Sequence, residues 1–151
     1  MLEFSHLMGA EGEQLKPIAL IIEGDFDIKE FYEITLVYFS APFRLVVEDS
    51  PVKGLDYYKE KKDEVDLIVL GKELTGKPAD DVAEEIRQIS GRADYPYILR
   101  LIGGEYLSSE NSRFMRERGV NEIIYEPLLP PITFIQKLNE IYRKLRIPKS
   151  E

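Results

Sequence analysis

The sequence lacks residue types on which several kinds of chemistry depend. It contains no cysteine and a single histidine, His6. Without cysteine there is no disulfide, no thiol nucleophile and no thiolate metal site, and such a composition fits a reducing cytoplasm. One histidine near the start of the chain is a poor basis for a catalytic triad or a histidine-based metal site. We therefore expect none of these chemistries here.

Long apolar runs and an excess of positive charge are also missing. No segment approaches the roughly 20 apolar residues of a membrane-spanning helix, and the N-terminus lacks the basic and then apolar order of a secretory signal. Lysine and arginine total 20 against 28 aspartate and glutamate, so the formal net charge is −8. A net acidic domain repels phosphate backbones. We expect a soluble cytoplasmic protein that binds neither nucleic acid nor membrane directly.

What the sequence does contain is a regular alternation of two kinds of segment. Five short apolar runs have the length of buried strands, and they cover residues 18–22, 43–47, 66–70, 95–102 and 121–125. The segments after them show apolar residues at helical spacing. Ser50-Pro51 is a typical helix start, and Gly119 a typical helix end. This alternation predicts a doubly wound parallel α/β sheet with helices on both faces.

The predicted domain covers residues 16–147 and leaves a segment at each end. For residues 1–15 two interpretations stay open: a leader without ordered structure, or an arm that packs on the domain. Residues 148–151 are expected to form a short tail. We find no internal repeat and no linker to a second domain.

The order and spacing of the segments resemble the receiver domain of two-component response regulators. Four stretches carry the resemblance, at residues 18–28, 65–87, 95–105 and 119–138. It implies a five-stranded (βα)5, flavodoxin-like fold with strand order 2-1-3-4-5. It also implies a cis peptide bond between Glu126 and Pro127.

Working receivers use a small set of residues for phosphoryl transfer. Two acids after the first strand hold Mg²⁺, and an aspartate at the end of the third strand takes the phosphoryl group. A threonine or serine after the fourth strand, an aromatic residue in the fifth and a lysine after the fifth complete the set. The chemistry needs an in-line nucleophile and cations that neutralise the transferred group.

The matching positions of this chain lack most of these groups. They are held by Glu23, Gly24, Asp25, Gly71, Leu101, Ile123 and Glu126. Gly71 stands at the acceptor position and has no side chain, while Glu126 reverses the charge of the lysine. The resemblance therefore implies a degenerate pseudo-receiver that is not an enzyme, takes no phosphoryl group and has no cofactor, Mg²⁺ included.

Two other functions remain open. An active receiver with a shifted acceptor would need another acid, but Asp66 lies five residues before Gly71, about 16 Å away along a strand. Glu73 lies in the following loop without a lysine or hydroxyl partner. The third function is an unrelated small-molecule-binding module or enzyme on the same fold.

Glu23, Asp25, Glu73 and Glu126 are weak metal candidates, and a solvated acidic rim is the favoured interpretation.

A domain without phosphoryl transfer is expected to act through protein–protein interaction in signal transduction, in a two-component or phosphorelay context. The partner is expected to be a signalling protein or a second copy of the chain. Receivers generally use the fourth helix, fifth strand and fifth helix for such contacts. The candidate interface residues are Phe114, Met115, Arg118, Ile132 and Gln136. The alternative is that the apolar members of this set belong to the core.

Overall fold

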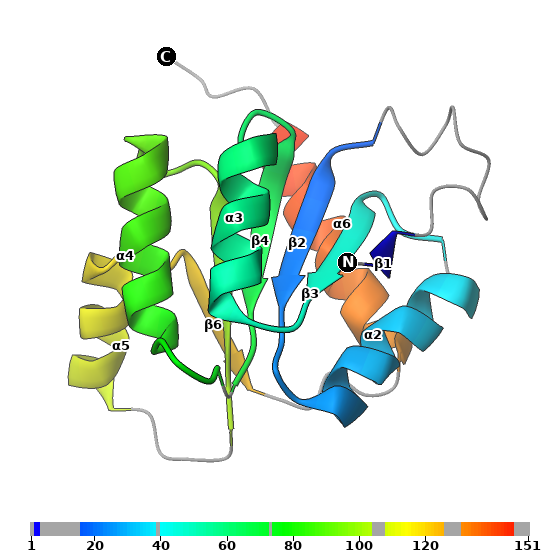
Figure 1. Ribbon diagram of the computed structural model, residues 1–151, viewed down its shortest axis with the longest axis horizontal. Coiled ribbons are helices and arrows are strands. Elements are labelled where there is room, and N and C mark those ends of the chain that lie inside the picture. Colours follow the sequence, from blue (N-terminus) through cyan, green and yellow to red (C-terminus); the bar gives the residue numbers. More distant parts are fainter. Residues whose placement is uncertain are drawn as a thin grey trace.

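A parallel sheet of five strands forms the centre of the molecule (Figure 1). The computed structural model describes residues 2–3, 16–38, 40–72, 74–103, 108–125 and 131–146. The parallel strands are β2 (Ile18–Ile22), β3 (Arg44–Glu48), β4 (Val65–Leu70), β5 (Tyr97–Ile102) and β6 (Glu122–Tyr125). Their spatial order is β3-β2-β4-β5-β6. The predicted order 2-1-3-4-5 is therefore confirmed.

A helix follows each of these strands. The helices are α2 (Phe26–Tyr38), α3 (Pro51–Lys61), α4 (Ala79–Ser90), α5 (Ser109–Glu117) and α6 (Pro131–Arg146). The start of α3 is as predicted, because the Ser50 side chain accepts a hydrogen bond from the Lys53 N–H and Pro51 is the first helical residue. Gly119 follows α5 with a φ of 115°, a conformation that glycine adopts without strain.

The alternating side chains of the strands build one apolar core on each face of the sheet. Helices α2 and α6 cover one face through residues such as Tyr32, Phe134 and Leu138. Helices α3 and α4 cover the other through residues such as Tyr58 and Ile86. Figure 1 shows α3 and α4 in front of the strands and α6 behind them. All five residues of β2 are fully buried, as expected for a central strand between two helical layers.

A short strand near the N-terminus, β1 (Leu2–Glu3), was not predicted. It pairs antiparallel with β3, opposite Val47 and Val46, at the edge of the sheet. The pairing covers backbone groups that an edge strand would otherwise expose. The rest of the predicted leader, the residues after 146 and the Glu126–Pro127 bond lie outside the described residues. Among the helices that are described, none is long and apolar enough to cross a membrane.

Candidate functional site

The residues that follow β2 and β4 lie side by side at the carboxyl edge of the sheet. The N–H of Gly71 donates to the carbonyl of Ile22 at 2.9 Å. The N–H of Glu23 donates to the carbonyl of Glu48, the last residue of β3, at 3.0 Å. Ladder-like bonds thus continue one residue beyond the strands. They hold Glu23 and Gly71 next to each other, as the resemblance implied for the acid pair and the acceptor position.

The carboxylate of Glu23 fills the space beside Gly71. Glu23 is 1% exposed although it carries a carboxyl group. A Cβ atom added at Gly71 would lie 2.5 Å from Oε1 and 2.7 Å from Oε2 of Glu23. Both separations are far below a normal van der Waals contact, so a side chain at position 71 and this position of the Glu23 carboxylate exclude each other.

Asp25 caps the first helix instead of completing an acid pair. Its Oδ1 accepts hydrogen bonds from the N–H of Asp27 at 2.9 Å and of Ile28 at 3.2 Å, at the start of α2. Its own N–H donates to Oε2 of Glu23 at 3.2 Å. A carboxylate at this place satisfies free amides and complements the helix dipole. Capping accounts for the presence of Asp25 without a metal.

The metal candidates do not assemble into a site within the described part of the chain. No group of three or more histidine, cysteine, aspartate or glutamate side chains there could hold an ion. Glu73 and Glu126, the other two acids that the sequence suggested, lie outside the described residues. Only Glu23 and Asp25 of the four candidates can be placed, and Asp25 is engaged by the helix start.

Two basic residues reach the same edge, and the sequence interpretation overlooked one of them, Arg100. Arg100, on β5, donates from Nη1 to the carbonyls of Gly71 at 2.9 Å and Leu101 at 2.5 Å. Lys72 lies across Gly103, where an added Cβ would be 2.8 Å from the lysine Nζ. Arg100 had a signal in the sequence, since it is the one charged residue in the run YILRLI. The position of Lys72 depends on its rotamer and had no such signal.

The positions aligned with the hydroxyl and the aromatic switch are apolar and packed. Leu101 is 0% exposed and belongs to the core under α2 and α6. Ile123 is half-buried against the core on the opposite face. Glu126, at the lysine position, lies outside the described residues. Leu101 therefore contributes to the stability of the core and offers no hydroxyl group to a ligand.

The predicted interface residues divide into exposed and engaged groups. Phe114 on α5 is 51% exposed and Ile132 on α6 is 42% exposed, and Gln136 is also exposed. Met115 is partly buried and packs against the core. The guanidinium of Arg118 forms ion pairs with Asp81 and Glu84 of α4 and lies 5.3 Å from the ring of Phe114. The accessible apolar part of this surface is thus Phe114 and Ile132, on helices that flank the edge strand β6.

A polar cluster ties α6 to the first residues of β5 and β6. Glu122 accepts hydrogen bonds of 2.6 Å from the Tyr97 hydroxyl and from the Lys137 ammonium group. Burial opposes ionisation of Glu122, but these two donors outweigh it and lower the pKa of the carboxyl group. Burial and the bond to Glu122 raise the pKa of Tyr97. The cluster lies at the amino-terminal ends of the strands, away from Gly71.

Comparison with known proteins supports the fold but assigns no family by sequence. No family model matches the sequence, and no curated protein is significantly similar to it. Among solved structures, a response regulator receiver domain protein from Clostridium thermocellum is 16% identical with a TM-score of 0.68, over 87% of this chain and 99% of that one. A CheY-like receiver domain protein from Methanospirillum hungatei is 19% identical with a TM-score of 0.67, over 85% and 95% of the two chains.

A third solved structure, the chemotaxis protein CheY4 of Vibrio cholerae, is 16% identical with a TM-score of 0.67. It is matched over 83% of this chain and 98% of its own length. The chain therefore has the receiver fold over nearly its whole length. Similarity at these levels of identity establishes the architecture, and the function has to be argued from the site.

Proposed function

We propose that this protein is a pseudo-receiver, which takes no phosphoryl group and acts by binding a protein partner in a cytoplasmic signalling pathway of the two-component type. The observation that carries the proposal is the arrangement of Gly71 and Glu23 at the carboxyl edge of the sheet. The position that aligns with the phosphoryl acceptor is Gly71, and the carboxylate of Glu23 occupies the space that an acceptor side chain would need.

The chemistry of phosphoryl transfer supports the same conclusion. The reaction needs a nucleophile in line with the leaving group and cations around the transferred oxygens. At this edge the Glu23 carboxylate is buried beside Gly71, and Asp25 caps α2. Arg100 donates hydrogen bonds from Nη1 to two backbone carbonyls, and it thereby joins β5 to the segment after β4. These groups have structural partners in place of a phosphoryl group and Mg²⁺.

The proposed binding surface contains the exposed apolar residues of α5 and α6. The resemblance to receivers implies protein contacts at this surface, and Phe114 and Ile132 present large apolar side chains to solvent. Aromatic residues that are exposed in the free protein are common anchors of protein interfaces. A signalling protein or a second copy of the chain is the proposed partner.

The proposal can be tested by capture of partners with the wild-type chain and with a Phe114→Glu, Ile132→Glu double variant. We expect the double variant to lose the partner, because two charges would be placed in a desolvated contact. Val52→Glu on α3 is the matched control, since Val52 is 66% exposed and lies on a helix outside the proposed surface. It should retain the partner.

The same capture is repeated after incubation with acetyl phosphate and Mg²⁺. The proposed mechanism predicts no change in binding, because Gly71 supplies no side chain at the acceptor position. Binding that depends on acetyl phosphate would contradict the proposal. Equal loss of the partner in the double variant and in Val52→Glu would place the binding surface elsewhere.

A further inference from the structure

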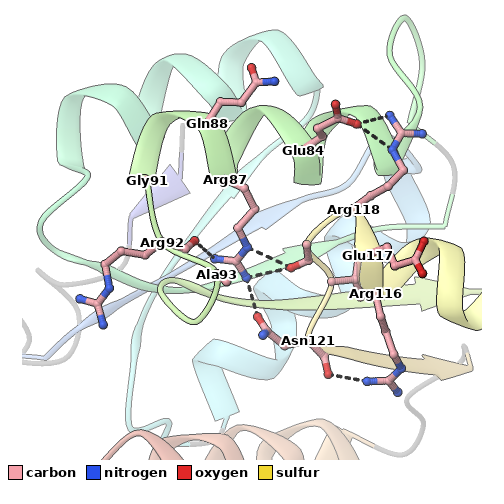
Figure 2. Close-up of a pocket in the computed structure, with 12 residues that line it drawn as sticks. Glu84, Arg87, Gln88, Gly91, Arg92, Ala93, Arg116, Glu117, Arg118 and Asn121 are labelled. Carbon is pink, nitrogen blue, oxygen red and sulfur yellow. Dashed lines mark hydrogen bonds and ion pairs between the residues drawn. The ribbon is translucent and has the colours of Figure 1, made fainter.

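A pocket lies between α4 and α5 at the amino-terminal edge of the sheet, opposite the edge that carries Gly71. Figure 2 shows it between the end of α4 and the turn that follows α5. Its volume is about 690 Å³, within the range of pockets that hold small organic ligands. The lining residues come from α4, the segment before β5, the end of α5 and the turn that follows it, and they include Arg87, Arg92, Arg116, Arg118 and Asn121.

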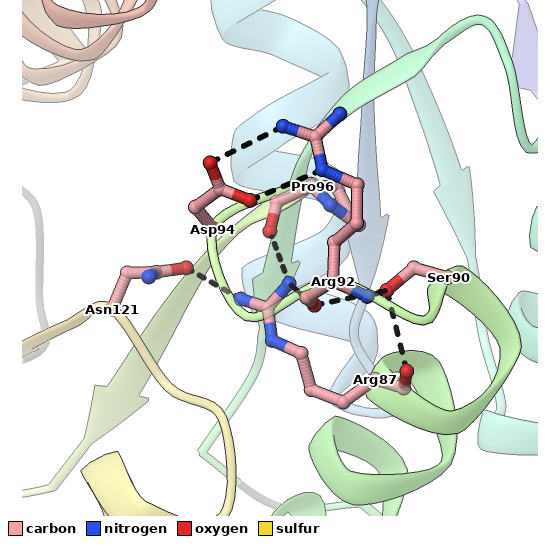
Figure 3. A network of polar contacts seen from close by, with 6 residues as sticks. All are labelled: Arg87, Ser90, Arg92, Asp94, Pro96 and Asn121. Atoms are coloured by element: carbon pink, nitrogen blue, oxygen red, sulfur yellow. Dashed lines mark hydrogen bonds and ion pairs between the residues drawn. The ribbon is translucent and has the colours of Figure 1, made fainter. Parts of the chain in front are cut away.

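The guanidinium of Arg87 donates hydrogen bonds from all three of its nitrogen atoms to the segments that form the wall of this pocket. Its Nε and Nη2 donate to the carbonyl of Gly119 at 3.0 and 2.8 Å, and Nη2 also donates to Oδ1 of Asn121 at 2.6 Å. Its Nη1 donates to the carbonyls of Pro96 at 2.8 Å and Arg92 at 3.3 Å. Figure 3 shows the guanidinium between these segments. The wall is therefore fixed before any ligand arrives.

The acceptors of Arg87 are neutral, so its positive charge is not cancelled by a bonded carboxylate. Burial lowers the pKa of Arg87, although Asp94 favours the charged form. A guanidinium remains charged at physiological pH in spite of such a shift. A half-buried charge of this kind produces a stronger electric field than an exposed one, because the surroundings screen it less.

Of the other charges of the lining, Arg116 adds to this field, Arg92 and Arg118 are paired with carboxylates, and Glu84 and Glu117 oppose it. The pocket carries four arginines against two glutamates, in a chain whose formal net charge is −8. Arg92 pairs with Asp94, and Arg118 pairs with Asp81 and Glu84. Arg116 donates one N–H to the carbonyl of Asn121 at 2.9 Å and forms no ion pair with the described residues. Among the described residues, its remaining N–H groups have no hydrogen-bond acceptor, which leaves them for a ligand.

From this arrangement we infer that the pocket binds a small phosphorylated molecule that carries two or more negative charges. Arg116 is the residue we assign to the phosphate groups, and Arg87, on the other side of Asn121, adds positive charge to the same pocket. Guanidinium groups match the geometry and charge of phosphate oxygens. The volume exceeds the needs of a bare phosphate, and Gly91, Ala93 and Val120 offer an apolar wall to an organic part of the ligand. This inference is independent of the chemistry at Gly71.

Isothermal titration calorimetry at low ionic strength, with inorganic pyrophosphate and with ADP in the absence of Mg²⁺, tests the inference. We expect the wild-type chain to bind at least one probe at a single site, with ADP tighter if the apolar wall contacts the organic part. Arg116→Gln should weaken binding by about tenfold or more, since it removes a charge-assisted hydrogen bond. Amide chemical shifts should change at Gly91, Gly119 and Asn121 when the probe is added.

Arg113→Gln is the matched control for this experiment. Arg113 lies on the same helix, is exposed, and does not line the pocket. The variant removes the same charge and should bind the probe as the wild-type chain does. If neither probe binds the wild-type chain, or if Arg113→Gln weakens binding as much as Arg116→Gln, the inference is wrong.

Discussion

At the scale of single residues, Gly71 and Glu23 have to be considered together. The glycine leaves a space at the end of β4, and the carboxylate at the end of β2 fills it. The absence of a side chain at Gly71 and the burial of Glu23 are therefore one packing arrangement. A side chain introduced at position 71 would therefore have to displace the Glu23 carboxylate.

Substitution of Gly71 by alanine tests this packing. The added Cβ would lie 2.5 to 2.7 Å from the Glu23 carboxylate, so the buried acid must move. We expect the free energy of unfolding to fall by about 1–3 kcal/mol, the usual cost of overfilling a packed site. Urea denaturation measures the change. The matched control is the same substitution in a Glu23→Ala background, where the loss should be smaller because the obstructing group is absent. Equal losses in the two backgrounds would contradict the packing arrangement.

At the scale of elements, polar clusters at the ends of helices and strands add to the apolar contacts of the two cores. Arg87 links α4 to the segments before β5 and β6, and Glu122 links β6 to α6 through Lys137. Each cluster joins residues that are distant in the sequence. The strand bounds followed closely from the apolar runs, and the start of α3 and the end of α5 from Ser50-Pro51 and Gly119. These clusters did not, because the spacing of apolar residues gives no information on which polar side chains will meet.

The Glu122 cluster predicts a pH dependence of stability. The pKa of Glu122 is lowered by folding, from an ordinary value near 4.5. Its contribution is therefore fully present above the unfolded pKa and is lost as the pH falls through the folded pKa. We expect Glu122→Gln to lower the free energy of unfolding at pH 7 by about 1–3 kcal/mol, as for a hydrogen bond to a charged group. The difference from the wild-type chain should shrink as the pH falls below about 4.5.

Urea denaturation of both chains between pH 7 and pH 3 measures this difference. Glu140→Gln is the matched control, because Glu140 pairs with the same Lys137 but is more exposed, at 44% against 17% for Glu122. Exposed ion pairs contribute little to stability, so this variant should differ less from the wild-type chain. A Glu122→Gln effect that stays constant across the pH range would show that ionisation of Glu122 is not involved.

At the scale of the whole molecule, the architecture was predictable and the state of the site was only partly so. The apolar runs at 18–22 and 66–70 predicted buried central strands, and both are fully covered by helices except for the half-buried Asp66. The sequence also predicted that Gly71 could supply no acceptor side chain. The burial of Glu23 and the reach of Arg100 could not be predicted, because rotamers and contacts depend on the packing around them.

Incubation with acetyl phosphate and Mg²⁺ followed by intact-mass measurement shows whether this chain accepts a phosphoryl group. A receiver domain that retains its acceptor aspartate is treated in parallel and must gain one phosphoryl group. The present account predicts that this chain keeps its original mass at every time point, because Gly71 has no side chain to phosphorylate and Glu23 fills the adjacent space. A stoichiometric gain of one phosphoryl group, with peptide mapping to an acid in the segment after β4, would contradict it.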